Sequence, residues 1–140
     1  MDLTGGVDMF EAIEIKTTEK YQMVEILEYV KQFVEKHHIK KGIVIVHVPH
    51  TTAALTMNKN FDPVVQEDIM KKLSELIPKE SHFNHIEGNS DAHIKASMFG
   101  NSETLIIEDG RLELGMFQSL FLCEFDGPRK RKINIKAFEG

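Results

Sequence analysis

The run Ile43-Val44-Ile45-Val46-His47-Val48 constrains the fold more than any other stretch of the chain. Five of its six side chains are β-branched, which favours an extended strand over a helix. Gly42 precedes the run and Pro49 ends it, as expected at the two boundaries of a strand. We therefore predict an interior strand at 43–48 that is buried on both faces, with the rest of a sheet assembled around it.

The remaining hydrophobic pattern adds further strands and helices to this one. Apolar and polar side chains alternate over residues 10–16, as in a half-buried strand, and Asp109-Gly110 predicts a type I′ hairpin turn. Amphipathic periodicity predicts helices at about 19–36, at about 63–77 after Asp62-Pro63, and at 90–99 before Gly100. Further strands are expected at 53–57, 104–108, 111–114, 116–125 and 132–138. This order predicts one α+β domain over residues 1–140, with a mostly antiparallel sheet or sandwich and two to three helices packed on it.

Composition narrows the class of protein. A chain of 140 residues fits one domain, and its single cysteine, Cys123, excludes an internal disulfide framework and fits a reducing compartment. No apolar run approaches the roughly 20 residues of a membrane span, and the start of the chain does not resemble a signal peptide. A net charge of −5 argues against a general nucleic-acid binder. We expect a cytoplasmic protein with neither a nucleic acid nor a membrane as its partner.

Ligand-type side chains are most concentrated in the stretch His85-Ile86-Glu87-Gly88-Asn89-Ser90-Asp91-Ala92-His93-Ile94-Lys95. An extended backbone places His85, Glu87 and Asn89 on one face. Helical periodicity begins near Ser90, which we interpret as an N-cap with Asp91 in the first turn behind it. A strand end that leads into a helix N-terminus gathers imidazoles, carboxylates and unpaired N–H groups. Either a metal ion or a phosphate can be held by such a set.

Three histidines, His50, His85 and His93, can together supply the three protein ligands of a catalytic metal ion such as zinc. Their spacing matches no strict motif such as HExxH. Each histidine can equally cap an element or fill a core, so the spacing alone leaves the metal site and a purely structural role both open.

Candidates for phosphate binding follow two of the predicted strands. Thr51 and Thr52 come after the strand at 43–48, although threonines in this position often bond the local backbone instead. Arg129 is a stronger anion candidate, because its planar guanidinium matches two phosphate oxygens at once. Arg131 is expected on a solvated face, and Glu124 either binds a cation, orients a histidine or is structural.

Four stretches of the sequence resemble the YjbQ family, and together they cover nearly the whole chain. They are His50-Thr51-Thr52-Ala53-Ala54-Leu55-Thr56, the segment 85–96, Leu114-Gly115 with Gln118, and Glu124-Phe125-Asp126-Gly127-Pro128-Arg129. The resemblance departs from the family pattern at two positions. Lys59 stands where a glutamate is common, which removes an acidic group near Asn58, and Phe117 stands where a tryptophan is common.

The resemblance implies an α+β domain assembled as a homotrimer, and an activity labelled secondary thiamine-phosphate synthase. That reaction joins hydroxymethylpyrimidine diphosphate to a thiazole phosphate and releases pyrophosphate; it is a side activity in at least some members. Carried over to this chain, the resemblance implies catalytic groups at Glu87, Asp91, Lys95 and Arg129. It implies phosphate binding by Thr51, Thr52, Asn89, Ser90 and Arg129, and a divalent ion, zinc or magnesium, near His50, His85 and His93.

Two other functions remain open from the residues themselves. One is a metal-dependent hydrolase of a small phosphorylated metabolite, in which a histidine-bound ion activates water and Glu87 acts as the base. Magnesium prefers oxygen ligands, so converging histidines suit this chemistry better than they suit a magnesium-assisted transfer. The other is a trimeric protein that binds a metal or a metabolite without turning it over.

Overall fold

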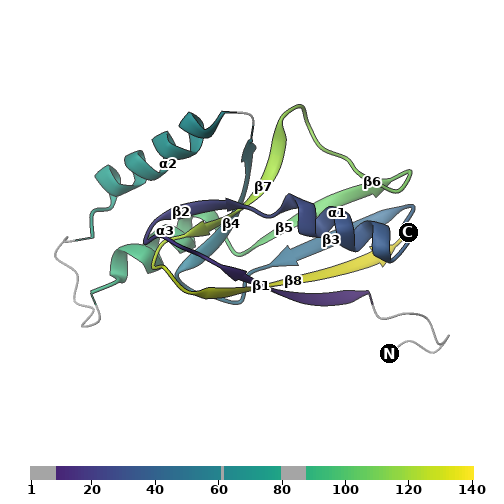
Figure 1. The fold of residues 1–140 in the computed structure, drawn as a ribbon, viewed down its shortest axis with the longest axis horizontal. Coiled ribbons are helices and arrows are strands. Elements are labelled where there is room, and N and C mark those ends of the chain that lie inside the picture. Colours follow the sequence, from purple (N-terminus) through teal and green to yellow (C-terminus); the bar gives the residue numbers. More distant parts are fainter. Residues whose placement is uncertain (1–8, 61, 80–87) are drawn as a thin grey trace.

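The computed structural model describes residues 9–60, 62–79 and 88–140. In chain order the elements are β1 (Phe10–Lys16), β2 (Gln22–Glu25), α1 (Leu27–Lys36), β3 (Gly42–His47), β4 (Ala53–Lys59), α2 (Pro63–Leu76), α3 (Ser90–Phe99), β5 (Ser102–Glu108), β6 (Arg111–Leu112), β7 (Gln118–Glu124) and β8 (Lys130–Glu139). The strands form a five-stranded sheet in the order β1-β8-β3-β5-β6 and a three-stranded sheet in the order β2-β7-β4 (Figure 1). Every strand pair among the described residues is antiparallel, which confirms the predicted α+β class.

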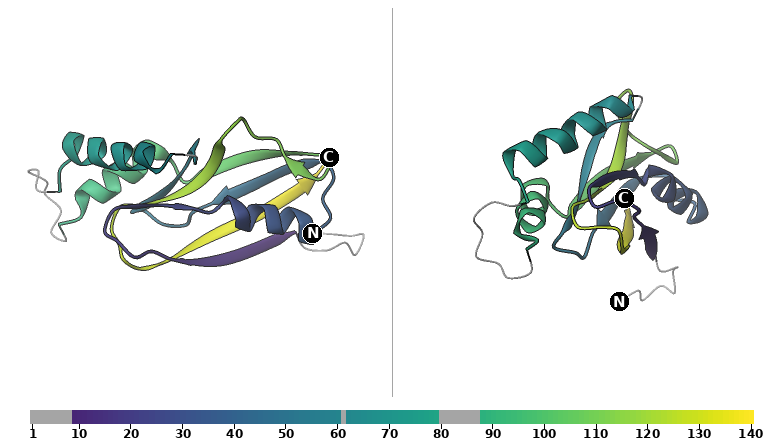
Figure 2. Two further views of the ribbon diagram at one scale, coloured as in Figure 1. Left: turned by 45° about the horizontal axis from the view of Figure 1, so that its top comes forward. Right: turned by 60° about the vertical axis from the view of Figure 1, so that its left-hand side comes forward.

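The main core lies on one face of the larger sheet. Helix α1 and the smaller sheet both pack on that face (Figure 2), with Val44 and Val46 of β3 fully buried beneath them. A second cluster lies on the other face of the smaller sheet. There Ala54 and Cys123 meet Leu73 of α2 and two alanines of α3. The molecule is therefore layered, and α3 is fixed against the end of the smaller sheet.

Strand β3 is interior, as predicted, but the prediction that it is buried on both faces is wrong. Its side chains alternate: Val44 and Val46 are fully buried, whereas Ile43 is 38% exposed on the opposite face. Within the described residues the larger sheet is antiparallel and covered on one side only, and β-branched composition does not distinguish such a strand from one covered on both sides. Apolar side chains therefore line an open sheet face.

The helix predicted at about 19–36 is also partly wrong. Residues Gln22–Glu25 form strand β2, and helix α1 begins only at Leu27. Met23 pairs with Cys123 of β7, and the Ile26 N–H donates to the Leu120 carbonyl at 2.9 Å. Pairing with a distant strand thus overrides a local pattern that fits a helix equally well.

The other local signals behave as predicted. Asp62 caps α2 by accepting from the Val64 N–H at 3.0 Å, and Gly100 follows α3. Asp109 and Gly110 both have positive φ, 51° and 74°, as a type I′ turn requires. One detail is corrected: Asn89 occupies the N-cap of α3 and Ser90 its first helical position. Among the described residues no helix is long and apolar enough to cross a membrane.

Candidate functional site

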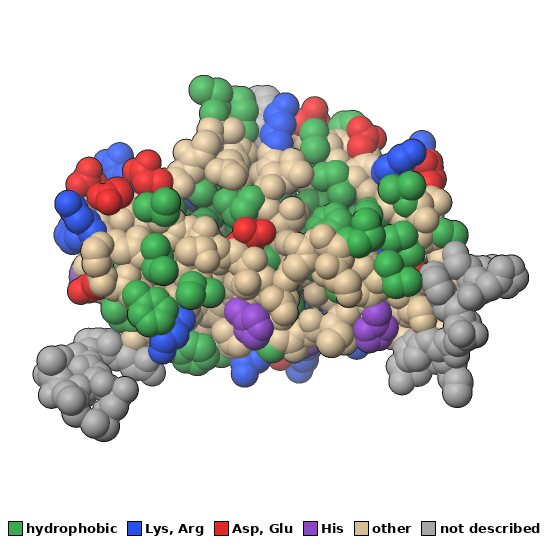
Figure 3. Space-filling view, turned by 180° about the vertical axis from the view of Figure 1, so that it is seen from behind, with side chains coloured by type: hydrophobic (Ala, Val, Ile, Leu, Met, Phe, Trp, Pro, Cys, Tyr) green, Lys and Arg blue, Asp and Glu red, His purple; other side chains and the backbone are tan. Residues whose placement is uncertain are grey.

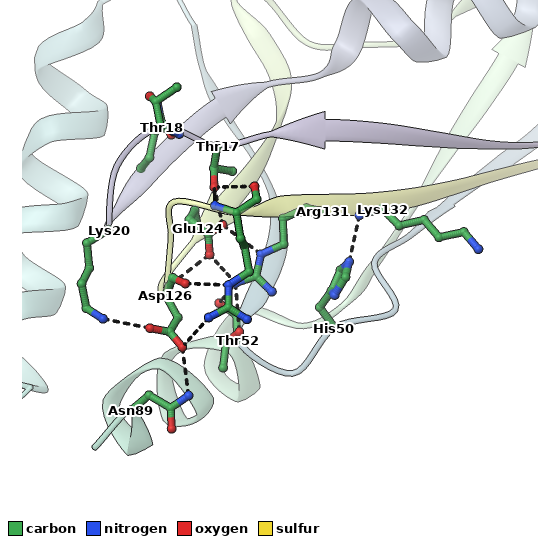
Figure 4. A network of polar contacts seen from close by, with 12 residues as sticks. Thr17, Thr18, Lys20, His50, Thr52, Asn89, Glu124, Asp126, Arg131 and Lys132 are labelled. Atoms are coloured by element: carbon green, nitrogen blue, oxygen red, sulfur yellow. Dashed lines mark hydrogen bonds and ion pairs between the residues drawn. The ribbon is translucent and has the colours of Figure 1, made fainter. Parts of the chain in front are cut away.

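Three segments meet at one end of the molecule: the loop after β3, the N-terminal turn of α3, and the turn between β7 and β8 (Figures 1 and 4). Asn89 Nδ2 donates to Asp126 Oδ2 at 2.9 Å, and Arg131 Nη2 donates to Thr52 Oγ1 at 2.9 Å. These two contacts join the segments directly. The convergence expected of the three loops is therefore present for the part of the chain that the structure describes.

A buried ion pair between Glu124 and Arg131 lies at the centre of this end. Arg131 Nε donates to Glu124 Oε1 at 2.9 Å, and Arg131 Nη2 contacts Glu124 Oε2. The Arg131 side chain is 2% exposed and the Glu124 side chain is 0% exposed. The prediction that Arg131 lies on a solvated face is therefore wrong. It came from the basic run around the residue, whereas strand alternation in β8 points Arg131 to the inner face beside Ile133.

Further donors complete the coordination of Glu124. Thr17 Oγ1 lies 2.7 Å from Oε1, and the Asp126 N–H donates to Oε2 at 3.0 Å. Burial raises the pKa of the Glu124 carboxyl, but the hydrogen bonds from Arg131 and Thr17 outweigh burial and the net pKa is below its ordinary value. Glu124 is thus a fixed carboxylate with a structural partner.

Thr51 and Thr52, predicted together as phosphate ligands, differ in their surroundings. Thr52 is 5% exposed, and Arg131 Nη2 donates both to its hydroxyl at 2.9 Å and to its carbonyl at 3.1 Å. Thr51 is exposed and lines a cavity. Of the two, only Thr51 has an exposed side chain at the cavity, where a ligand could contact it.

Asp126 is the second centre of the network (Figure 4). Lys20 Nζ lies 2.8 Å from Oδ1, Arg129 Nη2 lies 3.0 Å from Oδ2, and Asn89 donates to the same Oδ2. Burial raises the pKa of Asp126, but the bonds from Lys20 and Asn89 outweigh it, so the net pKa is lowered. The Arg129 side chain is oriented by Asp126 and remains 48% exposed, as an anion-binding group requires.

A third polar group lies on the buried side of α3. Lys95 Nζ is 3.1 Å from Asp91 Oδ2, and both side chains are 1% exposed. The Tyr21 hydroxyl donates to the same Oδ2 at 2.9 Å, and Lys95 Nζ stands 4.2 Å from the centre of the Tyr21 ring. Burial and then the Asp91 bond raise the pKa of Tyr21. Asp91 and Lys95 thus neutralise each other away from solvent.

Lys20 and Tyr21 belong to this site, and sequence reasoning missed both of them. They lie in the turn between β1 and β2, inside the segment predicted to be helical. No local signal distinguishes them from ordinary surface residues, because the partner of Lys20 is 106 positions away in the chain and the partner of Tyr21 is 70 positions away.

A cavity of about 500 Å³ lies beside these groups, between the end of β3 and α3. His50 and Thr51 line it from the loop after β3, and His93 and Ser97 line it from α3. The structure therefore brings together two of the three histidines predicted as metal ligands. His85 and Glu87 lie outside the described residues.

The His50 ring is held by the backbone of β8. The Lys132 N–H donates to His50 Nε2 at 2.8 Å, so the neutral ring carries its proton on Nδ1 (Figure 4). Burial lowers the pKa of His50, and the positive charge of Arg131 lowers it further. Glu124 acts in the opposite direction without reversing the net shift. His50 is therefore a neutral Nδ1–H donor in positive surroundings at pH 7.

No group of three histidine, cysteine or carboxylate side chains gathers into a metal site within residues 9–60, 62–79 and 88–140. The lone pair of His50 Nε2 is engaged by Lys132. The nearby carboxylates of Asp91, Glu124 and Asp126 are already paired with cations. A metal ion held by His50, His85 and His93 stays a prediction, and binding through His50 Nδ1 would require the ring proton to move to Nε2, with loss of the hydrogen bond from Lys132.

The first turn of α3 faces this same end. The Asn89 side chain donates to Asp126 and makes no cap hydrogen bond to the helix, and its Oδ1 is buried without a partner among the described residues. Ser90 is half-buried at the first helical position. Their predicted phosphate-binding roles stay predictions that are compatible with a position at a helix N-terminus.

A family model described as UPF0047 protein YjbQ-like matches residues 11–140. A UPF0047 protein of Methanocaldococcus jannaschii is 47% identical over 130 residues, covering 93% of this chain and 94% of that protein. The UPF0047 protein YugU of Bacillus subtilis is 42% identical, covering 91% and 98%.

Solved structures give the same result. An uncharacterized conserved protein of the YjbQ/UPF0047 family from Clostridium acetobutylicum superposes with a TM-score of 0.90 at 43% identity, covering 91% of this chain and 99% of that one. A YbjQ-like protein of unknown function from Sulfolobus solfataricus gives a TM-score of 0.89 at 34% identity, covering 94% and 96%.

Proposed function

The chain belongs to the YjbQ-like UPF0047 family, and from that premise we propose that it is a transferase acting on small phosphorylated substrates. The proposed reaction is that of a secondary thiamine-phosphate synthase, either as the main activity of the protein or as a side activity. The thiazole nitrogen attacks the methylene carbon of hydroxymethylpyrimidine diphosphate, the carbon–oxygen bond to the diphosphate breaks, and pyrophosphate leaves.

The observation that carries the proposal is the group of cationic side chains near His50, which lines the cavity. Arg131, Arg129 and Lys132 all act on His50 in the direction that lowers its pKa, and Glu124 opposes them without reversing the net shift. Burial makes the largest contribution to this lowered pKa and says nothing about the sign of a ligand, but the part that comes from the three cations favours an anion. The cavity volume of about 500 Å³ is within the usual range for small-molecule sites.

The roles of the residues follow from their exposure. We propose that His50 Nδ1–H, the Thr51 hydroxyl and Arg129 donate to phosphate oxygens, and that stronger donation to the leaving diphosphate lowers the barrier. Asp91 and Lys95 are each 1% exposed. We therefore give them a positioning role, fixing the first turns of α3, in place of direct contact with substrate.

A divalent ion, when bound, supplies further charge neutralisation on the diphosphate. Since the nearby carboxylates of Asp91, Glu124 and Asp126 are already paired, we propose that magnesium arrives with the diphosphate and not in a preformed protein cage.

The test is a direct assay of thiamine phosphate and pyrophosphate formed from the two substrates with magnesium present. We expect turnover by the wild type and a loss of about tenfold or more in His50→Gln, because a charge-assisted hydrogen bond to phosphate is removed. His38→Gln, at the far end of β3, is the matched control and keeps the wild-type rate. No product from the wild type, or equal loss in both variants, excludes the proposal.

A second candidate is the metal-dependent hydrolase, and the observation that favours it is that His50 and His93 line one cavity. Elemental analysis of the purified protein tests it, with a His85→Ala, His93→Ala double variant as comparison. Near-stoichiometric zinc that is lost in the double variant supports the hydrolase. No transition metal in either protein removes it. Tight substrate binding without any turnover supports a binding protein instead.

We also propose that the protein is a homotrimer that associates through the open face of the larger sheet. Ile43 pairs with Phe138 on β8 and with Ile106 on β5, and the three side chains are 38%, 47% and 55% exposed. The view from behind shows hydrophobic side chains on this side of the molecule, with charged side chains mostly toward its edges (Figure 3). Such an apolar row is typical of an interface.

Light scattering coupled to size-exclusion chromatography tests the assembly. Ile106→Glu is expected to convert a trimer to a monomer, because the new carboxylate would be buried without a partner. Leu76→Glu, on the exposed side of α2, is the matched control and leaves the mass unchanged. A monomeric wild type excludes the trimer, and an Ile106→Glu trimer excludes this face.

A further inference from the structure

A second cavity of about 500 Å³ lies at the opposite end of β3 from His50. The chain passes through this groove at Ile39 and Lys40, runs along β3, and reaches the His50 cavity. The six residues of β3 span roughly 20 Å, so the two cavities are separate sites. Helix α1 and the β5–β6 hairpin form the walls of the groove (Figure 1).

The floor of the groove is apolar. Val34 and Ile39 belong to the main core and are only 3% and 1% exposed. Leu112 and Leu114 are partly buried and pack against the same core. An apolar group resting on these four side chains would leave water for a surface that is continuous with the protein interior.

The rim of the groove is positively charged. Lys31, Lys40 and Arg111 line it, with Glu35 as the one carboxylate among its lining residues. The whole chain has a net charge of −5, so this excess of positive charge is local and opposes the overall sign. Lys40 Nζ lies close to the Asp109-Gly110 turn, at 3.9 Å from the position of a Cβ built on Gly110. Lys40 and Arg111 therefore flank one mouth of the groove.

The C-terminus of α1 does not cancel this charge. Three carbonyls of its last turn, which would repel an anion, are already paired: Phe33 O accepts from His37 N at 3.1 Å, and Val34 O accepts from Ile39 N at 3.2 Å. Glu35 O accepts from His38 N at 3.1 Å.

We propose that this groove binds a small amphipathic anion, with an apolar body on the floor and one carboxylate or phosphate group at Arg111 and Lys40. Both halves of such a ligand are matched: the floor by burial, and the rim by the planar fork of Arg111 and the charge of Lys40. A cation with the same body meets repulsion at the rim, and a small anion without the body gains nothing from the floor. The site is independent of the transferase proposal and shares none of its residues.

Isothermal titration calorimetry of the full-length protein with three probes tests the site. Octanoate carries both features, octylammonium carries the same body with the opposite charge, and acetate carries the charge alone. We expect saturable one-site binding of octanoate and at least tenfold weaker binding of the other two. Equal binding of octanoate and octylammonium would mean general hydrophobic adsorption and overturn the proposal, as would no binding of octanoate.

Variants locate the binding. Arg111→Glu is expected to weaken octanoate binding by about tenfold or more, because it removes the guanidinium and places a like charge at the rim. Lys71→Glu, an exposed position on α2, makes the same change in net charge and is expected to bind octanoate as the wild type does. Equal effects of the two variants would show that only net charge matters and would reject the groove.

A cross-check separates this site from the His50 cavity. His50→Gln is expected to leave octanoate affinity unchanged. Loss of octanoate binding in His50→Gln, with Arg111→Glu unaffected, would place the ligand in the other cavity and refute the inference. Far-ultraviolet circular dichroism of each variant confirms that the fold is retained.

Discussion

The two ends of β3 carry cavities of equal volume, about 500 Å³, but opposite construction. At the His50 end, charged side chains are buried in fixed pairs: Glu124 with Arg131, and Asp91 with Lys95. At the other end, cations surround an apolar floor formed by residues such as Ile39. The comparison shows how one fold holds a preorganised polar site and an adaptable apolar groove on the same strand.

The difference lies in what fixes each site. A buried ion pair has partners at one distance and angle, so it orients Thr52, Asp126 and the start of α3 with little freedom. Long exposed lysine side chains around a hydrophobic floor impose no such geometry. The polar end therefore suits chemistry on a specific substrate, and the apolar end suits binding by shape and charge.

The largest expected effect comes from breaking the polar end. Arg131→Met leaves the Glu124 carboxylate buried without its partner and should lower the free energy of unfolding by about 3–5 kcal/mol. Urea denaturation at a fixed protein concentration measures this. The control is Lys36→Met, which removes an exposed pair with Glu11 at 3.5 Å and should cost less than about 1 kcal/mol. Equal costs would show that the buried pair is not a structural centre.

Truncating a side chain in the floor of the groove should lower the free energy of unfolding somewhat less than Arg131→Met does. Ile39→Ala removes a side chain that is 1% exposed and is expected to lower the unfolding free energy by about 3 kcal/mol. No charge is involved, so this loss should be the same at pH 5 and pH 8 in denaturant titrations. A pH-dependent loss would contradict the assignment of the groove floor as apolar.

Removing Arg129 separates function from stability. Its side chain is 48% exposed, so Arg129→Ala should change stability little while raising KM for the diphosphate substrate about 10- to 100-fold, the value of a charge-assisted bond. Steady-state kinetics measure KM and kcat. Lys20→Met removes a different partner of Asp126 and serves as the control. If both variants raise KM equally, Arg129 acts only through Asp126 and does not bind substrate.

Acid should destabilise the polar end. The pKa values of Glu124 and Asp126 are lowered in the folded state, so the unfolded chain takes up protons first as the pH falls. The contribution of these two carboxylates to stability is therefore fully present above the ordinary carboxyl pKa of about 4, and it is lost as the pH falls through their lower folded pKa values. Thermal denaturation from pH 6 to pH 2 should show this fall, and Asp126→Asn should make it shallower. An unchanged slope in Asp126→Asn would show that another carboxylate is responsible.

The smallest effect concerns His50. Burial, followed by the charge of Arg131, lowers its pKa, so the folded state binds a proton less readily than the unfolded state. This contribution to stability is complete above the ordinary histidine pKa of about 6.5 and declines as the pH falls through the folded value. Titration of the His50 ring by NMR should give a pKa below the ordinary histidine value of about 6.5. A higher pKa would instead indicate an anionic environment and weaken the proposed phosphate site.

Local sequence signals predicted much of the fold. Alternation identified β1 at its observed bounds, Asp62-Pro63 marked the start of α2, and Asp109-Gly110 gave the turn type. Each signal acts within a few residues: a cap bonds the next turn, and positive φ suits glycine and aspartate. The motifs at His50 and in α3 likewise pointed to one site, and they do line one cavity.

What only the tertiary structure decided depends on partners far apart in the chain. Gln22–Glu25 is a strand because β7 offers it hydrogen bonds, although its own pattern fits a helix. Arg131 is buried because Glu124 and Thr52 satisfy its charge and its donors, and Tyr21 joins the site through Asp91, 70 residues away. Composition and periodicity indicate whether a side chain prefers apolar or polar surroundings. Only the packed structure determines which distant group meets that preference, because burial of a charge is favourable solely where its partner is already in place.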